Sequence, residues 1–162
     1  MNVEIRTRPA TPLVGIALKT SLRDERNLRE IPAFWRRLSQ DGALFRLAAG
    51  APIYGAVIEF DARSRDFTYL AGFEQPAAQP LPQGMQQSEL PAGRYAVLTT
   101  TPTPPENCGV EIAAGWLHLH RTWLPASGYL RGTGPEFERY DERFHAQRAL
   151  VELELWLPLG EE

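Results

Sequence analysis

The sequence predicts an α+β fold in which an antiparallel sheet carries two main helices on one face. Two stretches place apolar residues at helical spacing, and the segments around them alternate between apolar and polar residues as strands do. Both halves run strand, strand, helix, strand, strand, and each helix carries tryptophan. We therefore expect a tandem duplication within a single domain over residues 1–162, with halves of about 1–75 and 86–160 and a ligand cleft between them.

The first half is predicted to contain one helix and four strands. The helix is expected from about Asn27 to Gln40, with Pro32 tolerated because it lies in or near the first turn. Asp41-Gly42 then ends it. The apolar stripe of this helix consists of Ile31, Phe34, Trp35 and Leu38. The strands are expected at Val3–Ile5, Val14–Leu18, Tyr54–Phe60 and Phe67–Phe73, the last two as a hairpin.

The second half repeats this order after a connection rich in Pro, Gln and Ala at Gln75–Gln87. Its helix is predicted from spacings of four, three and four residues, and it should end in the segment Leu124–Tyr129. The helical stripe consists of Ile112, Trp116, Leu119 and Trp123. The strands are expected at Gln87–Leu90, Arg94–Thr100, Phe137–Tyr140 and Val151–Pro158.

The last strand has one apolar face and one face of mixed character. Alternation places Glu152, Glu154 and Trp156 opposite the apolar residues, and Glu138 and Tyr140 can join them if their strand lies alongside. Carboxylates among aromatic rings suit a cationic or polarisable organic ligand, because both attract positive charge. On the pattern alone, a solvated outer face is the alternative. A large exposed indole is unfavourable, so we expect a loop, a partner subunit or a ligand to cover Trp156.

Composition and charge exclude several classes of function. A formal net charge of -3 offers no broad attraction for nucleic acid or anionic membranes. The single Cys108 cannot form an intrachain disulfide, and the N-terminus lacks a signal-peptide run, so a cytoplasmic protein is expected. His118 and His120 lie on different faces of a helix, which argues against a metal site, and no phosphate-binding glycine motif points to a cofactor.

Several motifs in this chain resemble the GyrI-like (gyrase-inhibitor-like) family. This family includes the effector-binding domains of AraC-type and MerR-type multidrug regulators and stand-alone small-molecule-binding proteins. The motifs of the second half are Glu89–Val97, Trp116, Trp123–Tyr129, Phe137–Tyr140 and Glu154–Pro158. Weaker similarities in the first half are Ile31–Trp35, Tyr54-Gly55 and Tyr69–Glu74. The first strand begins at Val3, so we expect no DNA-binding domain.

The resemblance implies an aromatic cleft that binds bulky, often cationic molecules around a buried glutamate. The glutamate of the Phe-Glu-x-Tyr motif corresponds to Glu138 and that of the last strand to Glu154, and which of them is central stays open. Trp156 stands where family members carry Tyr, which removes a hydroxyl group. The implied ligand-binding residues are Glu138, Tyr140, Glu154, Trp156, Trp123, Trp35 and Tyr54.

Three functions are compatible with the resemblance. The first is stand-alone binding of hydrophobic or cationic small molecules, as an effector or drug sensor or as a sequestering protein. The second is hydrolysis of reactive cyclopropane compounds, in which Glu138 or Glu154 would activate water beside Tyr140. The third is inhibition of gyrase through a protein contact. A homodimer or a separate regulator protein remains open as a partner.

Overall fold

The computed structural model describes residues 1–76, 78–145 and 147–160, and its fold is α+β as predicted. The chain divides into two compact units, which we name by their order in sequence. The first unit is Thr11–Leu90, and the second unit combines Met1–Ala10 with the chain from Pro91 onward. Each unit contains a four-stranded antiparallel sheet and one main helix.

In the first unit the strand order is β3-β4-β2-β5, with every neighbouring pair antiparallel. The predicted hairpin is confirmed as β3 and β4. The short helix α2 was not predicted, because Asp41-Gly42 reads as the end of all helical structure there. The elements are β2 (Thr11–Ser21), a 3-10 turn (Arg23–Glu25), α1 (Arg26–Asp41), α2 (Ala43–Ala48), β3 (Ile53–Phe60), β4 (Asp66–Glu74) and β5 (Gln86–Leu90).

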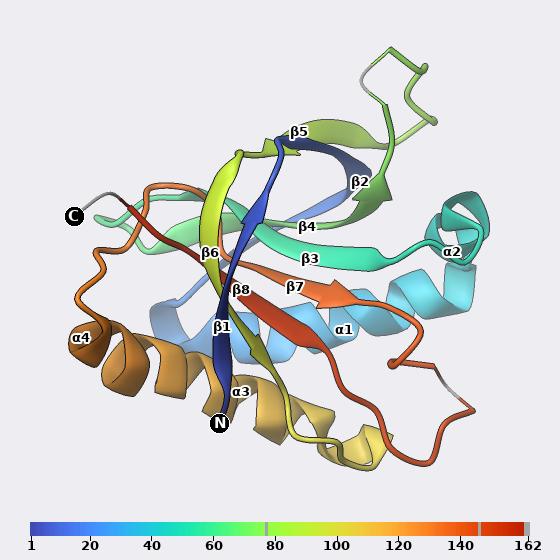
Figure 1. Ribbon diagram of the computed structural model, residues 1–162. Helices are drawn as coiled ribbons and strands as arrows, with labels where there is room; N and C mark the ends of the chain where they lie inside the picture. The colour runs from blue at the N-terminus through green and yellow to red at the C-terminus, as the bar shows by residue number, and fades with distance from the viewer. Residues whose placement is uncertain (77, 146, 161–162) are drawn as a thin grey trace. The chain divides into compact units, whose positions relative to one another are not determined.

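In the second unit the strand order is β1-β6-β8-β7, again antiparallel throughout (Figure 1). The last strand is shorter than predicted, because Val151 forms only an isolated bridge with Thr103. The elements are β1 (Val3–Arg8), β6 (Gly93–Thr99), a 3-10 turn (Pro105–Asn107), α3 (Cys108–His118), the π-helix η3 (Leu119–Trp123), α4 (Leu124–Ser127), β7 (Phe137–Tyr140) and β8 (Glu154–Pro158).

The units differ from the predicted halves in their first strands. β1 pairs with β6 along its whole length, from Val3 opposite Leu98 to Arg8 opposite Gly93, so it belongs to the second unit. β5 pairs with β2 and belongs to the first. Each half therefore gives its first strand to the sheet of the other half. The order of elements predicted the strands but contains no information about this exchange.

Helix α1 buries the predicted stripe. Phe34 and Leu38 are buried, and Gly42 ends the helix in the left-handed conformation (φ 76°), donating its N–H to the Leu38 carbonyl. The helix begins one residue earlier than expected, so Pro32 is its seventh residue and lies beyond the first turn. A proline there lacks the N–H that an interior position normally donates.

Helix α3 packs closely on the sheet of the second unit. A Cβ added to Gly115 would lie 2.5 Å from Leu155 Cδ1, so glycine permits this close approach of helix and strand. The predicted stripe faces the same sheet, with Leu119 fully buried and Trp116 and Trp123 partly buried. The apolar cluster beneath it consists of Ala96, Leu98, Leu119, Leu153, Leu155 and Leu157.

The helical run ends within the segment Leu124–Tyr129, as predicted. It continues through η3 and α4 to Ser127, and Gly128 then takes the left-handed conformation (φ 81°). None of the helices among the described residues is long and apolar enough to span a bilayer.

Candidate functional site

The register of β7 against β8 separates the predicted ligand-binding residues of the second unit. Glu138 pairs with Leu155, whereas Arg139 pairs with Glu154. Directly paired residues of antiparallel strands point to the same side of a sheet. Glu138 therefore shares a side with Leu155 and α3, and Glu154 lies on the other side. We call these the helix side and the arginine side.

The prediction that Glu138, Tyr140, Glu154 and Trp156 share one face is therefore wrong. Glu138 and Tyr140 lie on the helix side, and Glu154 and Trp156 on the arginine side. The alternation along each strand was predicted correctly. Because side chains alternate with a period of two, an error of one residue in pairing moves a whole strand to the opposite face.

On the helix side, Glu138 and Tyr140 form a carboxylate–phenol pair. The Tyr140 ring packs against the apolar cluster and contacts Phe144 edge to face, with centroids 4.9 Å apart. Burial raises the pKa of Tyr140 well above its ordinary value, and the negative charge of Glu138 adds to this effect. The hydroxyl is therefore protonated at neutral pH and donates a hydrogen bond to the Glu138 carboxylate.

Cys108, the first residue of α3, lies within electrostatic reach of this pair. A helix N-terminus favours thiolate, yet burial raises the pKa of the Cys108 thiol and the charge of Glu138 raises it further. The thiol is therefore protonated at neutral pH. Within residues 1–76, 78–145 and 147–160, no three His, Cys, Asp or Glu side chains gather in a way that could hold a metal ion.

Trp123 also belongs to the helix side. Its ring packs against the apolar cluster and stacks on Tyr129, with centroids 6.2 Å apart and planes 11° apart. Tyr129 also contacts Arg94, whose guanidinium carbon lies 5.5 Å from the centre of the Tyr129 ring. Half-buried rings of this kind offer stacking surface without leaving the core.

On the arginine side, Glu154 is a buried carboxylate surrounded by guanidinium groups. Its side chain is only 4% exposed. Arg6 and Arg143 donate to Oε2 at 3.0 and 2.8 Å, and Arg139 donates to Oε1 at 3.3 Å. Trp156 Nε1 donates to the same Oε1 at 3.1 Å.

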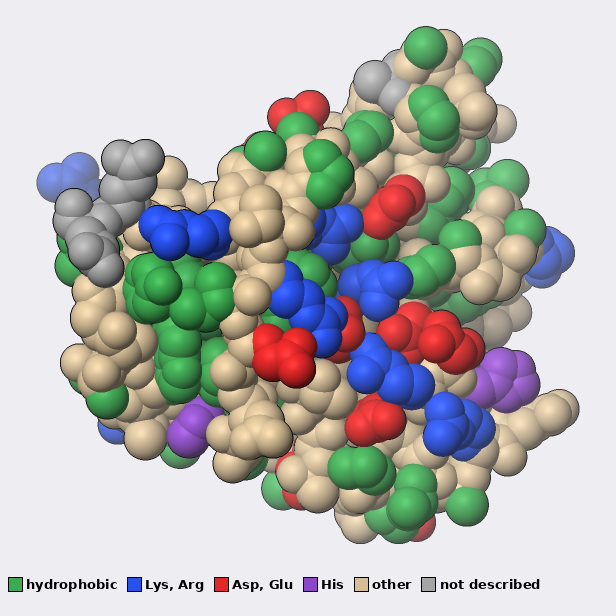
Figure 2. Space-filling view, viewed as in Figure 1, with side chains coloured by type: hydrophobic (Ala, Val, Ile, Leu, Met, Phe, Trp, Pro, Cys, Tyr) green, Lys and Arg blue, Asp and Glu red, His purple; other side chains and the backbone are tan. Residues whose placement is uncertain are grey.

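These contacts determine the charge state of Glu154. Burial alone would raise its pKa, but the hydrogen bonds from Arg143, Arg6 and Trp156 outweigh burial and lower it. Asp141 shows the same balance, because Arg143 and Arg139 both bind it. Figure 2 shows basic and acidic side chains next to one another over the region of β7 and β8. The carboxylates of Glu154 and Asp141 are therefore ionised, and both already accept hydrogen bonds from Arg139 and Arg143.

Trp156 is covered by the chain itself. Its indole is 5% exposed and stacks on Phe137, with centroids 5.3 Å apart and planes 15° apart. Tyr95 meets it edge to face at 5.6 Å, and the guanidinium carbons of Arg8 and Arg6 lie 5.1 and 5.8 Å from its ring centre. The indole is covered, as expected, but side chains of neighbouring strands cover it rather than a loop, a partner subunit or a ligand.

The two predicted ligand-binding residues of the first unit also lie on opposite sides of their sheet. Trp35, on α1, donates its Nε1 hydrogen to the Tyr69 hydroxyl at 3.1 Å. Tyr54 donates its hydroxyl hydrogen to Glu74. Tyr69 and Glu74 are five residues apart on β4, so their side chains point to opposite faces.

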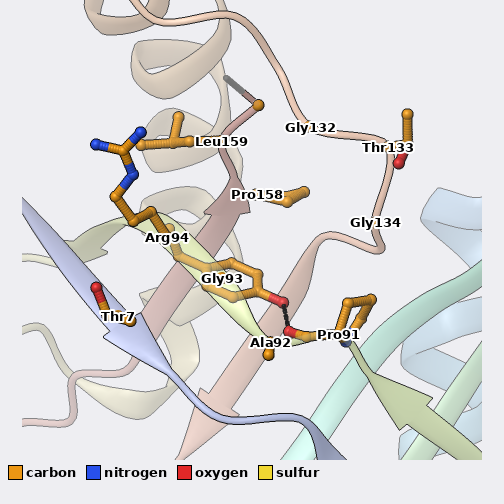
Figure 3. Close-up of a pocket in the computed structure, with 12 residues that line it drawn as sticks. Thr7, Pro91, Ala92, Gly93, Arg94, Gly132, Thr133, Gly134, Pro158 and Leu159 are labelled. Carbon is orange, nitrogen blue, oxygen red and sulfur yellow. Dashed lines mark hydrogen bonds between the residues drawn. The ribbon is translucent and has the colours of Figure 1, made fainter. Parts of the chain in front are cut away.

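A hollow of about 390 Å³ lies elsewhere in the second unit, at the start of β6 (Figure 3). Its walls come from the turn at Pro91–Tyr95, the loop Gly132–Gly134, the end of β8 and Thr7. The Tyr95 hydroxyl donates to the Pro91 carbonyl at 2.6 Å and closes one wall. None of the predicted ligand-binding residues lines this hollow, and none of the described residues that line it carries a carboxylate.

The arginines around Glu154 were missed by sequence reasoning. Arg6 follows the apolar Ile5 in β1, but its contact with Glu154 depends on the pairing of β1 with β6 and of β6 with β8. Arg139 and Arg143 lie two residues before and after Asp141 in the sequence. Only the fold brings these two arginines to Glu154 on β8.

The comparisons with known proteins agree with this α+β arrangement. A family model for the GyrI-like small molecule binding domain matches residues 1–159. The transcriptional regulator BrlR of Pseudomonas aeruginosa is 37% identical over 79 residues, which is 49% of this chain and 27% of BrlR. The chain thus spans only about a quarter of that relative.

Two solved structures share the fold over nearly the whole chain. SAV2435, solved with tetraphenylphosphonium bound, has a TM-score of 0.74 and 18% identity, covering 99% of this chain and 94% of that one. The C-terminal domain of EcmrR has a TM-score of 0.62 and 10% identity, covering 99% and 98%. At such identities the likeness establishes the fold alone.

Proposed function

Because this chain belongs to the GyrI-like small molecule binding domain family, we propose that it binds bulky organic cations on the helix side of β7. Glu138 attracts the positive charge, and Tyr140 supplies aromatic surface beside it. Trp35, which lies in the first unit, stays a prediction from the resemblance, and so does Trp123. Glu154, Trp156 and Tyr54 are left out of this site.

The observation that carries the proposal is the carboxylate–phenol pair of Glu138 and Tyr140 on the helix side. Glu154 is ionised and held by three guanidinium groups, so a cationic ligand would have to compete with them. Glu138 lies beside a phenol hydroxyl that stays protonated. A carboxylate next to aromatic rings, in surroundings of low polarity, interacts strongly with a desolvated cation.

The likeness to SAV2435 supports the ligand class. That protein was solved with tetraphenylphosphonium, a hydrophobic cation of four aromatic rings. Such a cation gains from ring stacking and from one carboxylate, and it needs no hydrogen-bond donor. The same chemistry is present on the helix side in the pair of Glu138 and Tyr140.

The test is a titration with tetraphenylphosphonium, followed by calorimetry. Glu138→Gln keeps the shape and removes the charge, and we expect it to weaken binding at least about tenfold, or about 1.4 kcal/mol. Glu152→Gln is the matched control, since it removes one carboxylate from the same unit outside the proposed site. Uncharged triphenylphosphine oxide should bind both variants alike.

Two outcomes would contradict the proposal. One is equal affinity of the wild type and Glu138→Gln for the cation. The other is a loss of similar size with Glu152→Gln, which would reflect net charge rather than a site. Mass spectrometry of cyclopropane compounds incubated with the protein tests the hydrolase alternative, for which a mass gain of one water is expected.

A further inference from the structure

The outer face of α3 carries apolar side chains that are exposed to solvent. Val110 is 70% exposed, Leu117 is 56% exposed, and Ala113 between them is exposed as well. They lie on the side of the helix opposite to Gly115 and Leu119, which pack on the sheet of the second unit. A helix that is apolar on all sides is normally covered on all sides. The outer face of α3 therefore has the composition of a contact surface.

One stripe along the helix joins these apolar residues to a charged residue at each end. Glu106 lies in the 3-10 turn before α3, and Arg121 lies in η3. Both side chains are exposed, and neither forms an ion pair with another residue in the described part of the chain. Spacings of three and four residues keep the members on one face of the helical run. The outer stripe consists of Glu106, Val110, Ala113, Ala114, Leu117 and Arg121.

The outer stripe is symmetric about its midpoint, which lies between Ala113 and Ala114. Val110 lies three residues before Ala113, and Leu117 lies three residues after Ala114. The acidic end lies seven residues before Ala113, and the basic end lies seven residues after Ala114. Apolar residues therefore match at equal distances from the midpoint, whereas the charges are opposite. A two-fold interface requires this arrangement, because residue i of each copy contacts residue j of the other.

We propose that two copies of this chain form a dimer through the outer stripe, with their α3 helices antiparallel. Val110 of each copy contacts Leu117 of the other, and the alanines at the two-fold axis let the helices approach closely. Glu106 of each copy pairs with Arg121 of the other, whereas parallel helices would bring like charges together at both ends. One helix face is a small interface, so we expect a dissociation constant in the micromolar range. The inference is independent of the proposed function, because the stripe points away from the sheet.

Sedimentation equilibrium of the purified chain at about 1 µM to about 0.5 mM measures the dissociation constant of the dimer. Leu117→Glu places a carboxylate in the apolar part of the interface, so we expect the dissociation constant to rise at least about tenfold. Leu130→Glu is the matched control, because it changes a leucine that is 61% exposed and lies outside the stripe. It should leave the dissociation constant unaltered.

Charge reversal tests the alignment of the two helices. In the antiparallel dimer, Glu106→Arg or Arg121→Glu places like charges opposite each other at both ends, so each variant alone should raise the dissociation constant about tenfold. In a parallel dimer neither substitution would add a repulsive pair. An equal mixture of the two variants restores opposite charges at both ends, so it should form a heterodimer about as stable as the wild-type dimer. Damage to the helix would not be repaired by mixing.

Three outcomes would overturn the proposal. If the wild type stays monomeric at about 0.5 mM, the stripe contacts a different protein instead of a second copy. If Leu117→Glu weakens the dimer no more than Leu130→Glu does, the dimer forms through another surface. If the single charge reversals dimerise like the wild type, or their mixture forms no heterodimer, the antiparallel alignment is wrong. Should Leu117→Glu not fold, Val110→Glu replaces it, because the Val110 side chain is even more exposed.

Discussion

The two sides of the sheet in the second unit contain similar residue types in different environments. On the arginine side, Glu154 accepts four hydrogen bonds and the indole of Trp156 is almost completely covered. On the helix side, Glu138 accepts a hydrogen bond from the protonated hydroxyl of Tyr140. A glutamate near tryptophan is therefore not by itself evidence of a binding site, because the same pair can be a structural support.

Trp156→Ala should produce the largest change in stability. The indole contacts two rings and two guanidinium groups, and its removal leaves a cavity, so we expect the free energy of unfolding to fall by about 3 kcal/mol or more. Urea unfolding followed by circular dichroism measures it. Trp123→Ala on the helix side is the control. It should lower the free energy of unfolding by less than Trp156→Ala does, because the Trp123 ring is only half-buried. If Trp123→Ala lowers the free energy of unfolding as much as Trp156→Ala does, or more, the idea that the arginine side contributes more to stability than the helix side is wrong.

Glu154→Gln should lower the free energy of unfolding by about 2 kcal/mol at neutral pH, through loss of a buried charge partner. The effect should depend on pH. The pKa of Glu154 is lowered in the folded protein, so its stabilisation is present above the unfolded-state value of about 4.3 and is lost as the pH falls through the folded value. We therefore expect the stability gap between wild type and variant to narrow as the pH falls from 6 towards 3.

Urea midpoints at several pH values measure this gap. Glu152→Gln should give curves parallel to those of the wild type. A gap that stays constant down to pH 3 would mean that the carboxylate acts by its shape, and the charge argument for the arginine side would then be wrong.

Tyr140→Phe should have the smallest effect and should act on binding. The substitution removes the hydroxyl that donates to Glu138 and keeps the ring, so we expect affinity for tetraphenylphosphonium to fall about threefold. Tyr95→Phe is the control. The Tyr95 hydroxyl donates a hydrogen bond to the Pro91 carbonyl, so this variant should lower the free energy of unfolding and leave the affinity for tetraphenylphosphonium unaltered. A larger loss of affinity from Tyr95→Phe than from Tyr140→Phe would contradict the placement of the site on the helix side.

Much of the local structure could be predicted because it depends on neighbours in sequence. The stripe of α1, the hairpin of β3 and β4 and the alternation along the last strand all follow from periodicity. Helix α2 was missed because it is only six residues long and follows a glycine that ends α1.

The sequence by itself determined which residues alternate, where the two main helices lie and that Trp156 needs a cover. Only the tertiary structure decided that β1 joins the second unit and that Glu138 pairs with Leu155 while Glu154 pairs with Arg139. The physical reason is that pairing between distant strands sets which side each residue faces, and a shift of one residue exchanges the sides. The two glutamates thus became distinguishable only when the register of β7 and β8 was known.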